Sequence, residues 1–350
     1  MKMMEKPGAV RIGIIGLGGI ARTHLEQCRA MGDHVILQAA AEADAGRCRQ
    51  VCSEYGITHC YDDGISMMDQ EELDGVIICV PPFLREPLIR CAVEKGIGAL
   101  CEKPLATGLE EGRRILDICR AHPEVPVLLN FKMRQGGNFQ RAKQWMDKEA
   151  GRPTAILARY ALVTDPDIWA PPRWFWDIKA SGGLLIENAG HMIDYIMWIA
   201  GKADMIWGYT KQKSIASLPE DYMRKSQTED HAVIVMEHEG GCTTTFVNTI
   251  CYPGNRDGSI EIATSRGYFL EISECVRLRI RKGEEILAEY EEEPYGIGDG
   301  YTLKQFIEVL KGGEKGWTAT AEDGYLALEA AVRARESART GNWVHIREKG

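Results

Sequence analysis

The chain has 350 residues, of which 45% are hydrophobic and 27% charged, the composition of an ordinary globular protein with room for two domains. Its net charge of −9 argues against nucleic acid or an anionic membrane surface as the main partner. No apolar run approaches the roughly 20 residues that a membrane-spanning helix needs, so no membrane association is expected.

The cysteines are the next compositional signal. There are 11 of them, an odd number, scattered from Cys28 to Cys275 without metal-like C-x-x-C pairs. This pattern favours reduced thiols in a cytosol over a disulfide framework or a zinc site. We therefore expect a cytoplasmic protein with no bound metal, whose cysteines fill core positions.

The first apolar segment, residues 10–15, predicts a buried strand that runs directly into a glycine-rich turn. The turn matches G-x-G-x-x-A and contains Gly16, Gly18, Gly19, Ile20 and Ala21. Glycines permit a tight turn and a close approach of the backbone to a pyrophosphate, and the small alanine lets the following helix pack near the strand. An amphipathic helix over residues 20–31 and a second strand over 35–41 supply the context that this motif requires.

The second strand ends at Glu42, which lies 21 residues after Ala21. This is close to the spacing expected for the acid that binds the adenosine ribose hydroxyls. A carboxylate there favours NAD and repels the extra phosphate of NADP. Arg47 and Arg49 are nearby but fall on the exposed face of the next helix, so we expect NAD, with NADP not excluded.

Strands and helices then alternate up to Asn130. Apolar strands are predicted to end at Val80-Pro81-Pro82, at Glu102-Lys103 and at Asn130, with helices over 84–95 and 109–121 between them. Repeated strand–helix alternation with nearly continuous apolar strands predicts a parallel, doubly wound sheet.

Lys103 stands at the end of one of these strands. Pro104 cannot donate to a sheet ladder and biases Lys103 towards extended geometry, so the strand should stop there. Right-handed crossovers would place the glycine turn, Glu42, Lys103 and Asn130 on the same sheet edge, where ligands bind in open α/β sheets. The alternative is a solvated Glu-Lys pair; the shared edge favours a functional lysine.

After Asn130 the pattern changes to a polar helix, a strand and an aromatic stretch. This stretch contains Trp169, Arg173, Trp174 and Trp176 beside two prolines. Tryptophan faces pack well against the C–H faces of sugars, and Arg173 could bind hydroxyls or a carboxylate. The alternative is that these residues pin a loop to the core.

A helix is predicted to run from the paired glycines 182 and 183 to Ala200. On it Glu187, His191 and Asp194 fall at i, i+4 and i+7, on one face of an otherwise apolar segment. Three ionisable groups on a buried face are costly unless they are paired or functional. A structural acid–histidine pair bracing the helix remains the competing interpretation.

Alternating segments between residues 204 and 280 predict a mostly antiparallel sheet, with one face against helices and the other free to meet a partner subunit. The acidic run 289–293 is expected to be a solvated face or loop. Two helices, over 301–310 and from Thr320 to Gly341, and a short strand over 343–346 close the chain.

The order of these motifs resembles the glucose-fructose oxidoreductase / inositol dehydrogenase / MocA family over nearly the whole chain. Glu102-Lys103-Pro104 combined with Glu187-x-x-x-His191 is far more specific than the glycine motif alone. The resemblance implies a Rossmann domain over residues 1–130 and a C-terminal α/β domain with a large open sheet over 131–350. It also implies homo-oligomers, dimers or tetramers, formed through that sheet, and NAD(P)-dependent oxidation or reduction of sugars, inositols or related polyols.

Three positions depart from the family pattern. Glu187 stands where many members have aspartate, Ala189 replaces a common glycine, and Arg85 occupies a place where histidine or asparagine is frequent. The departure at Arg85 affects the part of the pocket that follows the double proline.

In this interpretation His191 takes the hydroxyl proton as hydride leaves, because imidazole titrates at about pH 6.5. Lys103 stabilises the developing alkoxide, Glu187 orients the substrate or His191, and Asp194 holds the imidazole tautomer. The cofactor would be bound by the glycine turn and Glu42 together with Val80, Pro81, Pro82, Glu102 and Lys103. The substrate would be bound by Lys103, Glu187 and His191 together with Asn130, Arg173 and Trp174. Two alternatives stay open: a hydrolase that oxidises a sugar transiently on NAD, and a non-catalytic sugar and nucleotide sensor.

Overall fold

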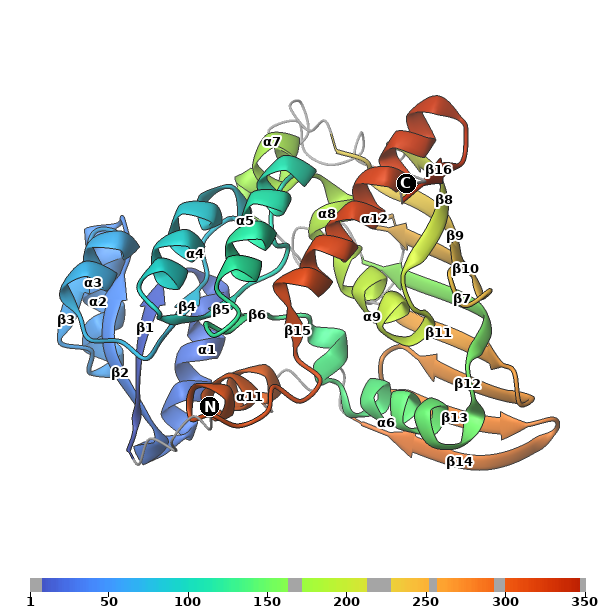
Figure 1. Ribbon diagram of the computed structural model, residues 1–350, viewed down its shortest axis with the longest axis horizontal. Coiled ribbons are helices and arrows are strands. Elements are labelled where there is room, and N and C mark those ends of the chain that lie inside the picture. The colour runs from blue at the N-terminus through green and yellow to red at the C-terminus, as the bar shows by residue number, and fades with distance from the viewer. Residues whose placement is uncertain (1–7, 163–171, 213–227, 252–256, 293–299, 347–350) are drawn as a thin grey trace. The chain divides into compact units, whose positions relative to one another are not determined.

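The computed structural model describes residues 8–162, 172–212, 228–251, 257–292 and 300–346 (Figure 1). The chain forms two compact units. The first comprises Met1–Ala106, Glu110–Phe131 and Ile297–Tyr325, and the second Thr107–Leu109, Lys132–Gly296 and Leu326–Gly350. Of the late part of the chain, the described residues 300–325 group with the first unit. None of the helices in the described parts of the chain combines the length and the apolar character that crossing a membrane requires.

The first unit is built on a seven-stranded sheet with the order β15-β6-β5-β4-β1-β2-β3. The strands are β1 Val10–Ile15, β2 Val35–Ala41, β3 His59–Tyr61, β4 Gly75–Ile78, β5 Gly98–Cys101, β6 Val127–Leu129 and β15 Ala319–Thr320. All neighbours pair in parallel except β15, which runs antiparallel to β6. The predicted parallel, doubly wound sheet is confirmed.

Helices connect these strands. They are α1 Gly19–Ala30, α2 Ala45–Tyr55, α3 Gly64–Gln70, α4 Arg85–Glu94, α5 Leu109–Ala121 and α11 Tyr301–Leu310, with short 3-10 turns η1 Gly32–His34 and η2 Pro82–Leu84. Helix α4 packs on β4 and β5 (Figure 1). The sequence explains the ends of α2, because the Asp44 carboxylate accepts hydrogen bonds from the first-turn amides and Gly56 closes the helix at φ +70°.

Helix α11 comes from the late part of the chain and packs against the central strands. A Cβ placed on Gly98 would lie 2.5 Å from a methyl of Leu310, and one on Gly75 would lie 2.7 Å from the other methyl. The two glycines therefore leave the space into which α11 inserts its apolar face. This contact explains why residues near 300 complete a core that begins at residue 10.

The carboxyl ends of the parallel strands align. Ile15 lies opposite both Ala41 and Ile78, Ile78 lies opposite Cys101, and Cys101 lies opposite Leu129. The residues that follow these strand ends therefore gather at one edge of the sheet, as the sequence predicted.

The second unit contains a nine-stranded sheet with the order β14-β13-β12-β11-β7-β10-β9-β8-β16. The strands are β7 Pro153–Ala161, β8 Ala203–Lys211, β9 His231–His238, β10 Thr243–Thr249, β11 Asp257–Thr264, β12 Tyr268–Ser273, β13 Arg277–Lys282, β14 Glu285–Glu291 and β16 Val344–His345. Strands β7 and β10 pair in parallel and the other neighbours antiparallel. The large, mostly antiparallel sheet is as predicted.

Strand β14 refines one expectation. The acidic run 289–293 was expected to be a solvated face or loop, and in its described part Glu289 and Glu291 are exposed; the missed feature is that residues up to Glu291 form a strand that extends the sheet beyond β13. Cross-strand charge pairing explains this, because Arg279 Nε lies 2.6 Å from Glu289 Oε1. Opposite charges across neighbouring strands stabilise the pairing of this edge strand.

The helical elements of the second unit are η3 Lys132–Gln135, α6 Gly137–Trp145, the π-helical turn η4 Met146–Ala150, η5 Arg173–Trp176, α7 Ile178–Ser181, α8 Leu184–Glu187, α9 Gly190–Ala200 and most of α12 Ala321–Thr340. Helix α9 packs on β7, and α6 packs on β12 and β13 (Figure 1). Side chains under this layer, such as Phe246 and Ile260, are fully buried.

The predicted helix up to Ala200 is interrupted. Helix α8 ends at Glu187, Asn188 and Ala189 form a turn, and α9 begins at Gly190. Glu187 and His191 therefore lie on two successive helices instead of one continuous face.

Candidate active site

The loop after β1 makes the turn that the glycine motif predicts. Gly16 has φ +82°, a left-handed conformation that favours glycine, and its N–H donates to the Ala41 carbonyl over 2.8 Å. A Cβ at this position would lie 2.9 Å from a Val80 methyl. Glycine is thus required for the loops after β1 and β4 to approach each other.

The next two glycines face open space. A Cβ on Gly18 or Gly19 would meet no atom within 4 Å. Gly18 precedes the first turn of α1, which has no side-chain cap and no acidic residue, while Ala21 is fully buried. An uncapped helix N-terminus next to open space suits an anionic group, so these residues fit the pyrophosphate of a dinucleotide.

Glu42 lies beside this turn. Its Oε2 accepts a hydrogen bond from the Leu17 amide over 2.8 Å, and its Oε1 accepts one from the Asp44 amide over 3.1 Å. The half-exposed Arg47 approaches the same carboxylate, with 3.4 Å between Nη1 and Oε2. The sequence placed Arg47 on the exposed face of α2, and the structure adds its contact with Glu42.

The two prolines after β4 lead into η2, where Pro82 is buried and Val80 and Pro81 are half-buried. Arg85 follows them and is buried. Its guanidinium donates to the Val80 carbonyl over 3.0 Å and also to the carbonyls of Glu102 and Pro104. The unusual arginine therefore links the loops after β4 and β5 through their backbones.

Glu102 is buried at the end of β5. His24 Nε2 lies 2.8 Å from its Oε1, and the Asn130 amide donates to the same oxygen over 2.6 Å. Burial acts to raise the pKa of Glu102, but the hydrogen bond and charge of His24, the hydrogen bond of Asn130 and the charge of Lys103 outweigh it, so the pKa is lowered. His24, from α1, was not singled out in the sequence.

Lys103 is half-buried between the buried residues Glu102 and Pro104, directly after β5. It stands on the same sheet edge as the glycine turn, Glu42 and Asn130, because the strand ends are in register. The structure thus brings together the first-unit residues that the sequence singled out.

In the second unit His191 occupies the first turn of α9 and Glu187 ends α8, and each is only 8% exposed. Asp194, one turn further along α9, is 1% exposed and forms a bidentate ion pair with Arg134, with distances of 2.8 and 2.7 Å. The sequence analysis predicted that Asp194 holds the imidazole of His191. It missed Arg134 as the partner of Asp194, because Arg134 lies 60 residues earlier in the chain.

The turn between α8 and α9 is held from the sheet. Asn248 on β10 donates from Nδ2 to Asn188 Oδ1 over 2.7 Å and to the Tyr160 carbonyl over 2.9 Å. Lys132 donates to the Tyr160 hydroxyl over 2.7 Å. These contacts position the segment that carries Glu187 and His191.

The aromatic stretch is described only in part. Trp169 lies outside the described residues, and of Arg173 only the backbone, at the start of η5, is described. Trp174 is half-buried, whereas Trp176 is 5% exposed and packs edge-on against Phe175 with a centroid distance of 5.2 Å. Trp176 therefore belongs to the core, and Trp174 retains exposed ring surface.

The parallel sheet, the open glycine turn and Glu42 beside it define a dinucleotide-binding Rossmann domain joined to a second α/β unit. Residues 10–131 match the sequence profile "Oxidoreductase family, NAD-binding Rossmann fold", and residues 139–270 match "GFO/IDH/MocA C-terminal domain". The chain belongs to the GFO/IDH/MocA oxidoreductase family. It is an oxidoreductase with an NAD-binding Rossmann domain.

Similar proteins align over the full chain. The myo-inositol 2-dehydrogenase of Thermotoga maritima is 25% identical over 348 residues, covering 97% of this chain and 99% of the relative. The inositol 2-dehydrogenase/D-chiro-inositol 3-dehydrogenase of Shouchella clausii is 25% identical over 94% of this chain and 93% of its own.

Solved structures share the fold. Levoglucosan dehydrogenase in complex with NADH and L-sorbose has a TM-score of 0.85 at 19% identity, covering 97% of this chain and 100% of the other. The WlbA dehydrogenase of Bordetella pertussis in complex with NADH and UDP-GlcNAcA has a TM-score of 0.80 at 20% identity, with coverage of 97% and 100%. These likenesses support the architecture of both units.

Proposed function

We propose that the protein transfers hydride between NAD and a secondary alcohol of a sugar, an inositol or a related polyol. The observation that carries this proposal is the alignment of the first unit's strand ends, which gathers the open glycine turn, Glu42 and Lys103 on one sheet edge. The substrate class is supported by the inositol dehydrogenases that align over the whole chain.

Bound at this edge, NAD would supply the hydride acceptor. The chain's own residues would bind the nucleotide: α1 presents its uncapped amides to the pyrophosphate, and Glu42 accepts hydrogen bonds from the adenosine ribose. Val80, Pro81 and Pro82 complete this part of the proposed cofactor site.

The proton of the alcohol requires a separate group. His191 is the proposed base, and its burial shields the imidazole from bulk water. The Lys103 ammonium would donate a hydrogen bond to the same hydroxyl and stabilise the negative charge that develops on its oxygen. Glu102, anchored by His24 and Asn130, fixes the backbone from which Lys103 projects.

The remaining residues would orient the substrate. Glu187 accepts hydrogen bonds from substrate hydroxyls or from His191, and Trp174 offers a half-buried ring to the C–H face of a sugar. Asn130 and Arg173 are the other proposed ligands of the hydroxyl groups. Asp194 acts through Arg134, because this buried pair holds α9, and with it His191, in place.

The test is a panel of polyols and sugars with NAD and NADP, following both the reduced cofactor and the carbohydrate product. We expect Lys103→Met and His191→Ala each to lower kcat by at least about 100-fold. Lys95→Met and His122→Ala, which remove exposed residues of the same types, should leave kcat within about twofold.

Near-wild-type turnover in both Lys103→Met and His191→Ala would overturn the assignment of these residues. Release of a sugar without accumulation of NADH would indicate a hydrolase, and binding of sugar and nucleotide without turnover would indicate a sensor. Either result contradicts net oxidation of an alcohol.

We further propose that the protein is a dimer or tetramer through the large sheet. Leu157, 56% exposed on β7, lies opposite Thr245, which lies opposite Val235, which in turn lies opposite Trp207. The exposed Leu157 and the half-buried Val235 and Trp207 lie on the sheet face away from Ile156 and Ala158, which are buried. A partner subunit would cover this face.

A further inference from the structure

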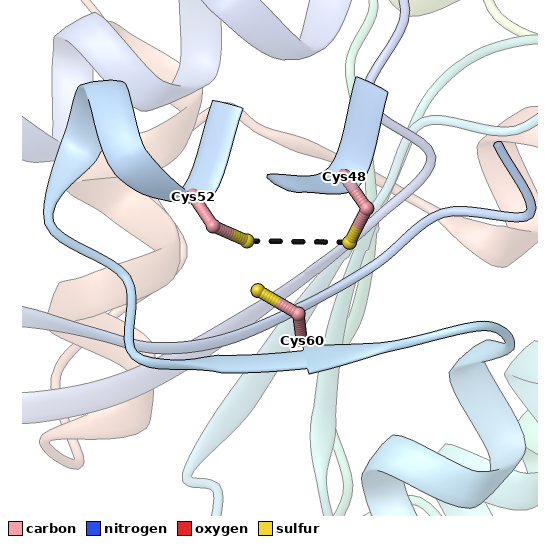
Figure 2. A group of neighbouring side chains, drawn as sticks. All are labelled: Cys48, Cys52 and Cys60. Carbon is pink, nitrogen blue, oxygen red and sulfur yellow. Dashed lines mark hydrogen bonds between the residues drawn. The ribbon is translucent and has the colours of Figure 1, made fainter. Parts of the chain in front are cut away.

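Three cysteines that are separated in the sequence meet at the edge of the first unit. Cys48 and Cys52 lie one turn apart on α2, and Cys60 lies on β3, the edge strand of the sheet. Their sulfur atoms all lie within 4.8 Å of one another, and Cys60 points towards the pair on the helix (Figure 2). Within the described residues no other group of three potential metal ligands is this close.

The cluster is open on one side. Cys48 and Cys52 are 4% and 3% exposed, whereas Cys60 is exposed to solvent. An ion can therefore approach the cluster from the side of Cys60, while the two helical cysteines are almost fully buried. A metal ion can thus enter beside the accessible Cys60 and be held by the buried pair Cys48 and Cys52.

The spacing of the sulfurs fits a shared metal ion. Two thiolates that bind one zinc ion at about 2.3 Å in tetrahedral or trigonal geometry lie about 3.8–4.0 Å apart. Cys48 Sγ and Cys52 Sγ are 4.0 Å apart. A disulfide would need about 2.05 Å and a specific dihedral angle, which two side chains on successive turns of one helix do not readily adopt. An all-sulfur ligand set selects soft cations.

We propose that Cys48, Cys52 and Cys60 form a three-thiolate site for a thiophilic metal ion, Zn²⁺, with the fourth coordination position open to water on the Cys60 side. This site adjoins the NAD-binding edge, because Cys48 Sγ lies 3.9 Å from the Tyr61 carbonyl to which the Glu42 amide donates. It uses none of the residues assigned to the proposed reaction and does not rest on that reaction. The exposed Cys60 departs from the expectation that the cysteines fill core positions, and the proposed site would depart from the expectation that no metal is bound. Their spacing resembles no zinc motif, because the fold brings Cys60 back against α2.

Binding of Zn²⁺ to the three cysteines would release protons from their thiol groups. Each thiol loses its proton to solvent as its Zn–S bond forms, so up to three S–H bonds break for one zinc ion bound. Coordination would also tie the three-residue strand β3 to α2.

The experiment uses the full chain, reduced and stripped of metal with a chelator. Cd²⁺ and Co²⁺ titrations are followed through the thiolate-to-metal absorption bands, and Zn²⁺ is then added as a competitor. We expect one ion per chain, displacement by Zn²⁺, and protection of Cys60 from alkylation when Zn²⁺ is bound. Zn²⁺ should also raise the thermal midpoint of unfolding, because it binds only the folded chain.

Cys60→Ser is the decisive variant, because its side chain is exposed and its loss spares the core. We expect it to bind Cd²⁺ and Zn²⁺ at least about tenfold more weakly and to lose the Zn²⁺-dependent rise in the midpoint. Cys91→Ser, at a half-buried cysteine of α4 outside the cluster, should behave as the unsubstituted chain. Cys48→Ser should reproduce the Cys60→Ser result if it folds.

Two results would overturn the site. One is equal metal affinity and stoichiometry in Cys60→Ser and the unsubstituted chain. The other is a metal-free chain that shows no thiolate absorption band with Cd²⁺ or Co²⁺ and no change in Cys60 alkylation with Zn²⁺.

Discussion

Glu42 shows how one side chain can select a cofactor through charge. Its carboxylate accepts hydrogen bonds from two backbone amides, so its position beside the glycine turn is fixed. Arg47 Nη1 lies 3.4 Å from Glu42 Oε2, and the negative charge of the carboxylate offsets the positive charge of the arginine. Removing the acid would leave a guanidinium where the extra phosphate of NADP would need a partner.

Glu42→Ala is therefore expected to shift preference towards NADP. The ratio of kcat/KM for NADP to that for NAD should rise by about tenfold or more, because a repulsive charge is lost and Arg47 is released. Steady-state kinetics with both cofactors measures the ratio. Adding Arg47→Ala should remove most of the gain, and an unchanged ratio in Glu42→Ala would contradict this role.

Glu102 provides a prediction about pH. Its pKa is lowered in the folded chain, so its carboxylate contributes stability that is fully present above its unfolded pKa near 4.5 and is lost as the pH falls through the lower folded value. Glu102→Gln should lower the free energy of unfolding by about 1–3 kcal/mol at pH 7, since a buried charge-assisted hydrogen bond is weakened.

Urea unfolding at pH 7, 5 and 4 tests this expectation. The difference between Glu102→Gln and the unsubstituted chain should shrink as the pH falls from about 4.5 towards the lower folded pKa, because the unfolded chain then binds a proton that the folded carboxylate does not. Glu94→Gln, at an exposed position of α4, should show no such trend. A pH-independent difference would mean that the charge of Glu102 is not what stabilises the fold.

At the scale of elements, Arg85 joins two strand-end loops. Its buried guanidinium donates to carbonyls after β4 and after β5, including those on either side of Lys103. These carbonyls would lose their partner in Arg85→Met, which keeps much of the side-chain length.

We expect Arg85→Met to lower the free energy of unfolding by about 1–3 kcal/mol, because buried carbonyls are left unsatisfied. Since Lys103 would be less firmly placed, kcat should fall by about tenfold, with a smaller effect on the KM for NAD. Stopped-flow kinetics and urea unfolding separate the two effects. Arg90→Met on the exposed side of α4 is the matched control, and unchanged kcat in Arg85→Met would exclude a positioning role.

The elements that could be predicted are those with local patterns. The strand before Gly16, the strand ending at Glu42 and the helix from Thr320 all carry their signals within a few residues. Their common sheet edge followed from the handedness of crossovers. The first-unit part of the candidate site was therefore predictable from the sequence.

What was missed depends on contacts between distant segments. The sequence around Asp194 does not indicate its contact with Arg134, and the sequence around Glu102 does not indicate its contact with His24, because each partner comes from another element. The turn at Asn188 is held by Asn248 from a strand that follows 60 residues later. Cys60 joins Cys48 and Cys52 for the same reason: proximity in the fold has no counterpart in their spacing.

At the scale of the whole molecule, the chain completes its first unit only after building the second. Helix α11 fills the space over Gly75 and Gly98, and β15 pairs with β6 at the end of the sheet. The first unit therefore depends on residues near both ends of the chain. Its stability cannot be assigned to residues 1–130 alone.

The large sheet of the second unit bears on assembly. Its helix-covered face buries Ile156, Phe246 and Ile260, whereas the opposite face presents Leu157 and Tyr209, which are 56% and 37% exposed. Leu157, Val235 and Trp207 share one row with Thr245, and Tyr209 lies in the neighbouring row of the same face. These apolar side chains form a patch that a second copy of the same sheet can cover with the same residues. The proposed assembly would therefore be sensitive to a single charge at the middle of the row.

Leu157→Glu is expected to weaken self-association by at least tenfold in Kd, since burying an unpaired carboxylate at an interface costs more than about 1.4 kcal/mol. Analytical ultracentrifugation over a range of concentrations gives the oligomeric state. The free energy of unfolding of the isolated subunit should change by only about 0.5 kcal/mol, because Leu157 is exposed within the subunit. Ile36→Glu introduces the same charge at an exposed strand residue of the first unit and should leave association unchanged. If Leu157→Glu and the unsubstituted chain sediment alike as oligomers, subunits associate through another surface; if both are monomers, the open face serves no self-association.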